Sequence, residues 1–344
     1  MHLRGQLECE MKMRVVTTRC PYVPFMFLLL VALGCHEFSM SVWAQSGAPL
    51  TPRNTGLSRD IEPSQSIHVD VDLTLVNVSV TDPYDRSVSG LEKDNFRVFE
   101  DNAEQEVVNL SSEDVPISIG VILDLSGSMA DKIGRAKESA LEFLKTANPL
   151  DEAFLVTFND RAALLAPFTS SVEDLTSRLL SASARGRTAL LDATYLGLSE
   201  MRKARNSKRA LLIISDGGDN NSRYNEKDIE RLVREADTQI YSIGIFEPFE
   251  YRSRTQEELN GPSLLNEITD LTGGRAFNAV NANELPDIVT KIGTELRNEY
   301  TLGYRSSNRT HDGGWRKIKI KLRTPKGLPP LSVYAKKGYR APSS

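Results

Sequence analysis

The sequence has few of the residues on which thiol chemistry and triad catalysis depend. Its three cysteines, Cys9, Cys20 and Cys35, all lie near the N-terminus, and only His68 and His311 of its four histidines lie beyond residue 36. A product without this N-terminal stretch contains no disulfide, no thiolate and no cysteine-bound metal. Because the two remaining histidines lie in separate strand-rich regions, a Ser-His-Asp triad is nearly excluded.

Extreme charge and long hydrophobic runs are also lacking. The chain has 344 residues, a formal net charge of −4 and an ordinary globular composition, so nucleic acid and anionic membranes are not expected as partners. Its length allows two or three domains with a sizeable core. The apolar run Phe25–Leu33 is shorter than the roughly 20 residues that span a bilayer, so no transmembrane span is predicted in the mature chain.

The first 44 residues have the layout of a secretory signal peptide. Basic residues, among them Lys12 and Arg14, precede the apolar run, and Val42-Trp43-Ala44 offers small residues for cleavage before Gln45. We therefore expect an exported protein, periplasmic or secreted. An alternative is a lipoprotein anchored to the envelope through an acylated Cys35, although Ala32 stands where leucine is usual in such sites.

Two β-rich flanks enclose the central part of the chain. After a Pro/Ser/Gly-rich linker at 45–65, the region 66–112 alternates apolar and polar residues, and 299–344 does so again. In the first flank the alternation changes phase after Leu75, which predicts a β-bulge or a bend near that residue. Neither flank has enough strands to bury a core alone. We predict that together they form one β-sandwich into which an α/β domain at 113–298 is inserted.

Strand-like and helix-like segments alternate through the central domain, which predicts an α/β fold with a doubly wound, mostly parallel sheet. The predicted strands are Ile117–Leu123, Ala153–Phe158, Ala162–Ala166, Arg209–Ile214, Gln239–Phe246 and Ala276–Asn278. The predicted helices are Asp131–Ala147, Val172–Ser181, Ala189–Ala204, Glu226–Asp237, Leu264–Leu271 and Leu285–Arg297.

Five oxygen-bearing side chains follow three of these strands. Asp124, Ser126 and Ser128 come directly after the first strand, Thr188 precedes a helix, and Asp216 follows the strand ending near Ile214. The pattern Asp-x-Ser-x-Ser is weak evidence by itself. However, strand-to-helix passages of a parallel sheet meet at its carboxyl edge, where such sheets bind ligands.

These residues resemble the von Willebrand factor A domain and its metal-ion-dependent adhesion site. The resemblance rests on Asp124–Ser128, Arg187–Ala193 and Ile214–Gly217 and covers about residues 114–297. The flanks, with Phe96–Asp101 and Tyr300–Tyr304, resemble exported bacterial proteins labelled "VWFA-related". This chain has Asn102 where those proteins usually have glycine.

The resemblance implies a site for Mg²⁺ or Mn²⁺. Ser126, Ser128 and Thr188 would bind the ion directly, while Asp124 and Asp216 would act largely through water. Mg²⁺ prefers oxygen ligands and keeps several waters, and neutral hydroxyls leave much of its charge uncancelled. The expected function is therefore the binding of a protein partner through an Asp or Glu, without catalysis.

Two other interpretations remain open. Ser126 and Ser128 would cap the following helix while Asp216 serves only as a turn residue, leaving a scaffold domain without a metal-dependent ligand. Alternatively, the ion would activate water for hydrolysis, although no histidine is at hand as a base and no P-loop pattern occurs.

Two surface features add further hypotheses. The insertion Glu247–Pro262 follows a strand and is expected at the metal's edge, where Phe249 and Tyr251 would contact a partner or pack on their own domain. A second set of residues is predicted to line the outward face of a strand and to protect a sheet edge, or alternatively to bind a polyanion. This basic set is Arg316, Lys317, Lys319, Lys321 and Arg323.

Overall fold

The computed structural model describes residues 73–246 and 256–343, which fall within one compact unit, Ile67–Ser344. The predicted signal peptide, the linker, the start of the first strand, and Phe249 and Tyr251 lie outside these residues. Among the described helices, none combines the length and apolarity needed to cross a bilayer.

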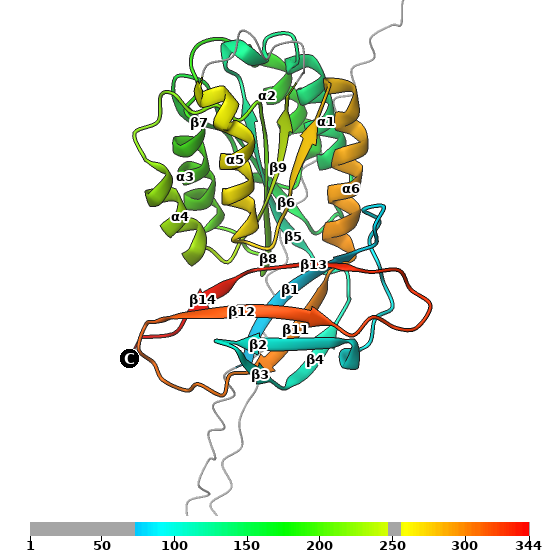
Figure 1. The fold of residues 1–344 in the computed structure, drawn as a ribbon. Helices are drawn as coiled ribbons and strands as arrows, with labels where there is room; N and C mark the ends of the chain where they lie inside the picture. Colours follow the sequence, from blue (N-terminus) through cyan, green and yellow to red (C-terminus); the bar gives the residue numbers. More distant parts are fainter. Residues whose placement is uncertain (1–72, 247–255, 344) are drawn as a thin grey trace, which may run out of the picture. The chain divides into compact units, whose positions relative to one another are not determined.

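The central element is a six-stranded sheet in the order β10-β9-β8-β5-β6-β7 (Figure 1). Its neighbouring strands pair in parallel except β7, which is antiparallel to β6. All eight residues of β5 are buried, as expected of a strand covered on both faces. The strands are β5 (Ile117–Asp124), β6 (Glu152–Phe158), β7 (Ala162–Thr169), β8 (Lys208–Ser215), β9 (Gln239–Ile245) and β10 (Ala276–Ala279).

Helices cover both faces of this sheet. One apolar cluster joins α1, α2 and α6 to Ile119 and Val121 of β5, and a second joins α3, α4 and α5 to Ile122 of the same strand. Successive β5 side chains therefore contribute to opposite cores. The helices are α1 (Ile133–Lys145), α2 (Val172–Ser181), α3 (Leu190–Met201), α4 (Glu226–Glu235), α5 (Gln256–Asp270) and α6 (Leu285–Arg297).

The helix α5 begins eight residues before the predicted start at Leu264. Leu264, Leu265 and Ile268 are buried and carry the apolar pattern, whereas Leu259 is 39% exposed. Pro262 lies inside the helix, where it removes a backbone hydrogen bond. The first half of α5 thus lacks the apolar periodicity on which the prediction depended.

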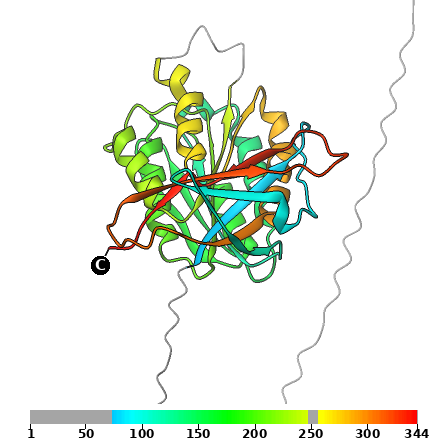
Figure 2. The same ribbon diagram turned by 60° about the horizontal axis from the view of Figure 1, so that its bottom comes forward.

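Two four-stranded sheets form the flanking sandwich, and each contains strands from both ends of the chain (Figure 2). One sheet has the order β13-β1-β11-β4 and the other β14-β12-β2-β3. Their core contains Val76, Val78, Phe96, Val98 and Leu302. The predicted fold class, an α/β sheet inserted into a β-sandwich built from both flanks, is confirmed. The strands are β1 (Leu73–Thr81), β2 (Phe96–Glu100), β3 (Ala103–Gln105), β4 (Val107–Ser111), β11 (Tyr300–Arg305), β12 (Trp315–Leu322), β13 (Ser332–Ala335) and β14 (Gly338–Arg340).

The predicted β-bulge near Leu75 is wrong. β1 pairs with β11 in unbroken register from Leu73 to Val78. Val76 and Val78 face the sandwich core, whereas Leu73 and Leu75 are 39% and 51% exposed. The change of phase in the sequence therefore marks apolar residues on the outer face of a regular strand.

The prediction for the basic strand is corrected in part. β12 lies between β14 and β2, but β14 pairs only with Trp315–Lys317, so among the described strands one edge of β12 has no partner beyond Lys317. Lys317, Lys319 and Lys321 are exposed as expected, but Arg316 is only 6% exposed and shares the inward face with Ile318. Its guanidinium Nη2 donates to Asp312 Oδ1 at 2.9 Å, which satisfies the buried charge.

Candidate functional site

The strand β5 delivers Asp124 to the carboxyl edge of the sheet. This carboxyl group is fully buried. Its Oδ1 accepts a hydrogen bond from the backbone N–H of Ser126 at 2.8 Å, and its Oδ2 accepts one from the hydroxyl of Ser215 at 2.6 Å. Asp124 therefore shapes the loop that follows β5 and fixes it to the end of β8.

Ser126 and Ser128 place two hydroxyl groups above this carboxylate. Their Oγ atoms lie 3.1 Å apart, and Ser128 is exposed while Ser126 is buried. Ser126 occupies the N-cap position of the short 3₁₀ helix Gly127–Met129 without a capping side-chain bond, and α1 has no side-chain cap either. The capping interpretation thus does not account for Ser126, whose hydroxyl bonds to Ser128.

The loop before α3 lies against the β5 loop. Gly127 donates its N–H to the carbonyl of Gly186 at 2.9 Å, and Arg185 donates its N–H to the carbonyl of Leu125 at 2.7 Å. Gly186 has a positive φ of 86°, and a Cβ there would lie 2.6 Å from Asp160 Oδ2, so glycine is required. These bonds hold the loop that carries Thr188 at the same edge as Ser126 and Ser128.

The loop after β8 completes the arrangement. The carbonyl of Thr188 accepts the N–H groups of Asn220 and Asn221 at 3.0 and 3.1 Å, and the Thr188 N–H donates to Asn220 Oδ1 at 3.1 Å. Gly217 packs so closely on α5 that a Cβ would lie 2.8 Å from Gly261 Cα. The loop before α3 is therefore hydrogen-bonded to both of the other loops, and the bond from Ser215 to Asp124 joins the ends of β8 and β5.

The electrostatics of this edge favour a cation. Burial and the negative charge of Asp216 raise the pKa of Asp124 to about 7, against the hydrogen bonds from Ser215 and Ser126. Asp216 itself is 5% exposed. This edge therefore carries two buried carboxyl groups of like charge and the hydroxyl groups of Ser126 and Ser128, and such hard oxygen atoms are the kind of ligand that Mg²⁺ or Mn²⁺ prefers.

The described residues contain no cluster of three or more His, Cys, Asp or Glu side chains suited to a metal. This finding does not test the predicted set, which contains only two carboxylates beside three hydroxyls. The structure brings together the loops that carry all five residues. Coordination of one ion by Asp124, Ser126, Ser128, Thr188 and Asp216 remains a prediction.

Several supporting residues were missed by sequence reasoning. Ser215 bonds both Asp124 Oδ2 and the N–H of Gly217, and Asp160 Oδ1 accepts the N–H of Arg187 at 2.9 Å. Asp219 Oδ1 accepts the N–H of Leu190 at 2.9 Å and so caps α3 from another loop. Only Ser215 had a sequence signal, its position directly before Asp216, because the other bonds join loops distant in sequence.

Comparison with known families supports the class of domain that this geometry defines. Residues 119–218, which include all five predicted site residues, match the model of the von Willebrand factor type A domain. This part of the central α/β region is therefore similar to a von Willebrand factor type A domain.

One relative is an uncharacterized protein of Borreliella burgdorferi, 28% identical over 184 residues. The match covers 47% of this chain and about half, 53%, of the relative.

Solved structures of low sequence identity share parts of the fold. BatB from Bacteroides thetaiotaomicron is 19% identical with a TM-score of 0.42, over 52% of this chain and 98% of that chain. A von Willebrand factor type A protein from Catenulispora acidiphila is 12% identical with a TM-score of 0.46, over 78% and 74%. Proximal thread matrix protein 1 from the mussel byssus, with a zinc-occupied MIDAS motif, is 17% identical with a TM-score of 0.44, over 57% and 49%.

Proposed function

We propose that this protein is a metal-dependent binding module that captures a carboxylate of a protein partner at the carboxyl edge of its α/β sheet. The observation that supports the proposal is the hydrogen bonding of the loops after β5 and β8 to the loop before α3, at an edge that carries two buried acidic side chains and the exposed Ser128 hydroxyl. A bound Mg²⁺ or Mn²⁺ would supply an electrophilic centre for an Asp or Glu of the partner.

The chain's own contacts fit an indirect role for Asp124. Both of its oxygens already accept hydrogen bonds, from Ser126 N–H and from the Ser215 hydroxyl. These bonds orient the carboxylate, which would in turn orient the ligands of the ion. Ser126, Ser128 and Thr188 would then hold the ion directly, and the neutral hydroxyls would leave it attractive to an outside anion.

Binding is favoured over hydrolysis by the groups available. Type A domains are generally interaction modules. His311 is the only histidine among the described residues, and it lies in the loop after β11, in the sandwich. Arg187 lies near the proposed site, with its N–H bonded to Asp160, and a cation there attracts an acidic ligand. Hydrolysis of a carboxylic or phosphoric ester that depends on Mg²⁺ and is lost in Asp124→Ala would contradict a purely binding role.

Metal binding is tested by thermal unfolding of the purified protein with and without Mg²⁺ or Mn²⁺. A site saturated at about a hundred times its Kd stabilises the folded state by about 2.7 kcal/mol, which raises the Tm by several degrees. Asp124→Ala and Ser128→Ala should abolish or reduce the rise. Ser128 is exposed, so its loss is not expected to unfold the protein.

The matched control is Ser177→Ala, which removes an exposed hydroxyl of α2 that bonds the Asp174 carbonyl of its own helix, and it should leave the metal response intact. If the unmutated protein shows no shift with either ion, the metal site is refuted and the domain is a scaffold. A pull-down from the envelope fraction in Mg²⁺ and in EDTA, with Asp124→Ala alongside, then tests capture of the partner.

We also propose export with cleavage before Gln45, since the leader has the required basic, apolar and small-residue segments. Mass spectrometry of the exported product should find a chain that begins at Gln45. A product that begins at an acylated Cys35 would instead establish the envelope lipoprotein.

A further inference from the structure

A groove of about 910 Å³ lies in the sandwich, remote from the proposed metal edge. The sandwich contacts Lys208 and Gln239 at the amino ends of β8 and β9, whereas the three loops lie at the carboxyl ends (Figure 1). The groove is bordered by the start of β1, the loop after β11 and the segment around β14. Its lining includes Leu73, Leu75, Arg305, Arg309, Lys336 and Arg340.

One side of the groove is an open sheet edge. β1 pairs with β11 from Leu73 to Val78, but its other edge pairs with β13 only from Val78 to Thr81. Within the described part of the chain, no strand covers that edge from Leu73 to Asn77. Every second residue there directs its N–H and C=O toward the groove. Exposed Leu73 and Leu75 make this edge a template for an added strand.

The rim of the groove is positively charged. Arg305 and Arg309 are exposed, and no ion pair joins either of them to another described residue. Lys336 pairs with Asp237 at 3.1 Å, and Asp237 is the only acidic residue among those that line the groove. An occupant with carboxylates therefore complements the rim, even though the whole chain is acidic.

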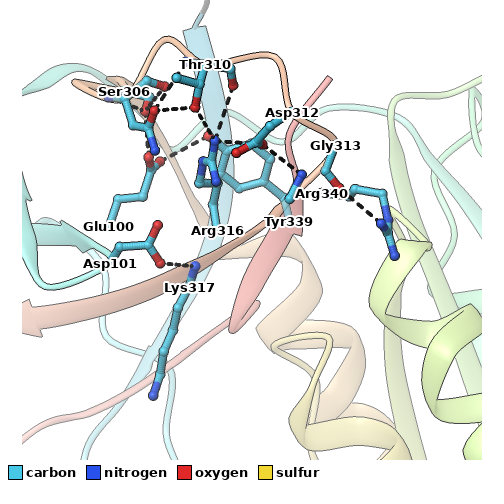
Figure 3. A network of polar contacts seen from close by, with 12 residues as sticks. Glu100, Asp101, Ser306, Thr310, Asp312, Gly313, Arg316, Lys317, Tyr339 and Arg340 are labelled. Carbon is cyan, nitrogen blue, oxygen red and sulfur yellow. Dashed lines mark hydrogen bonds and ion pairs between the residues drawn. The ribbon is translucent and has the colours of Figure 1, made fainter. Parts of the chain in front are cut away.

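The wall of the groove that the loop after β11 forms is held in place by polar contacts (Figure 3). Glu100, 2% exposed, accepts hydrogen bonds from Ser306 Oγ at 2.5 Å and from the hydroxyl of Tyr339 at 3.0 Å. Arg316 donates to Thr310 Oγ1 at 2.7 Å. Because these bonds fix the loop after β11 to the sandwich, an occupant does not have to order this wall.

We propose that this groove binds an extended acidic segment of a protein partner, which adds as a strand along Leu73–Asn77. Main-chain hydrogen bonds to β1 would hold the segment, and its carboxylates would face Arg305 and Arg309. Five residues of strand span roughly 17 Å, and alternate side chains contact Leu73 and Leu75. The groove requires no metal and is independent of the proposed adhesion site.

The probe is a fluorescein-labelled seven-residue peptide of alternating Asp and Val, followed by fluorescence anisotropy in EDTA. Three comparisons test the mode of binding. A peptide methylated on alternate backbone nitrogens retains its charge but loses donors to the sheet edge. A peptide with Lys in place of Asp reverses the charge, and inorganic polyphosphate is the competitor that reports a general polyanion site.

The protein variant is Arg305→Glu/Arg309→Glu, and its matched control is Lys319→Glu/Lys326→Glu, at exposed positions outside the groove. We expect Arg305→Glu/Arg309→Glu to lower the affinity for the acidic peptide at least about tenfold. The control variant should lower it less than about twofold. The unmutated protein should bind the methylated peptide with an affinity at least about tenfold lower, and it should not bind the Lys peptide.

Equal binding of the methylated peptide, or displacement by polyphosphate as effective as by unlabelled peptide, would overturn strand addition. Absence of binding by the acidic peptide would overturn it as well. Asp124→Ala should bind the peptide normally. Failure of the metal site and failure of the groove are therefore distinguishable.

Discussion

Glu295, in the last turn of α6, is a buried acid that pairs with Arg275, which also pairs with Asp85 of the sandwich. Its Oε2 accepts a bond from Arg275 Nη1 at 3.0 Å and its Oε1 one from the Tyr241 hydroxyl at 3.1 Å. Burial raises the pKa of Glu295 above its ordinary value, and the positive charge of Arg275 offsets only part of this effect. The folded protein therefore binds a proton at this position more readily than the unfolded chain does.

This raised pKa predicts a pH-dependent stability. Because the native state binds more protons between the unfolded pKa near 4.5 and the raised pKa, this residue's contribution to the free energy of unfolding falls as pH rises through that window. Glu295→Gln stays neutral, and its stability relative to the unmutated protein should increase with pH. Urea unfolding from about pH 4 to 8 measures the difference.

Glu138→Gln is the matched control, since Glu138 also pairs with an arginine, Arg135, but is 53% exposed. Its stability relative to the unmutated protein should vary little over the same range. A difference for Glu295→Gln that is constant with pH would show that this carboxyl group does not titrate in the expected window.

At the scale of elements, the sequence predicts segments whose pattern depends on a buried face. α2 and α6 have the predicted bounds, because apolar spacing coincides with clear ends such as the Ser171 hydroxyl that accepts the Asp174 N–H. The first half of α5 was missed because it has no apolar periodicity and contains Pro262. The phase of β1 was misread because Leu75 is apolar yet lies on the outer face.

The candidate site also has a part that the sequence predicts and a part that it does not. Asp124 and Asp216 stand directly after buried strands, so the topology of a parallel sheet is enough to bring their loops to one edge. The bonds that align these loops, such as Gly127 N–H to Gly186 carbonyl, join residues far apart in sequence and involve backbone groups. Such contacts carry no residue-type signal, so sequence predicts which loops meet and not how they are held.

At the scale of the whole molecule, the inserted domain and the sandwich share a buried ionic junction. Glu299, between α6 and β11, pairs with Lys208 Nζ at 2.9 Å, and side-chain exposures are 1% and 8%. Its Oε1 also accepts bonds from Ser79 of the sandwich at 3.0 Å and from Gln239 of β9 at 2.6 Å. Loss of this carboxylate would therefore leave a buried lysine charge and weaken contacts in both parts.

We predict that the two parts unfold as one cooperative unit. The six α-helices of the described residues all lie in the inserted domain, so far-ultraviolet circular dichroism reports mainly on it. Trp315, in β12 of the sandwich, is the only tryptophan beyond Trp43, so fluorescence of the cleaved protein reports on the other part. The two probes should give coincident urea transitions.

Glu299→Gln should move both transitions together, by about 3 to 5 kcal/mol, because it leaves the Lys208 charge without its buried partner. Arg178→Gln, which removes an exposed ion pair of α2 with Asp174, should shift neither by more than about 1 kcal/mol. If the fluorescence transition stays in place while the dichroism transition moves, the junction does not couple the domains. Ligand binding at the metal edge would then have no energetic route through Glu299 to the sandwich.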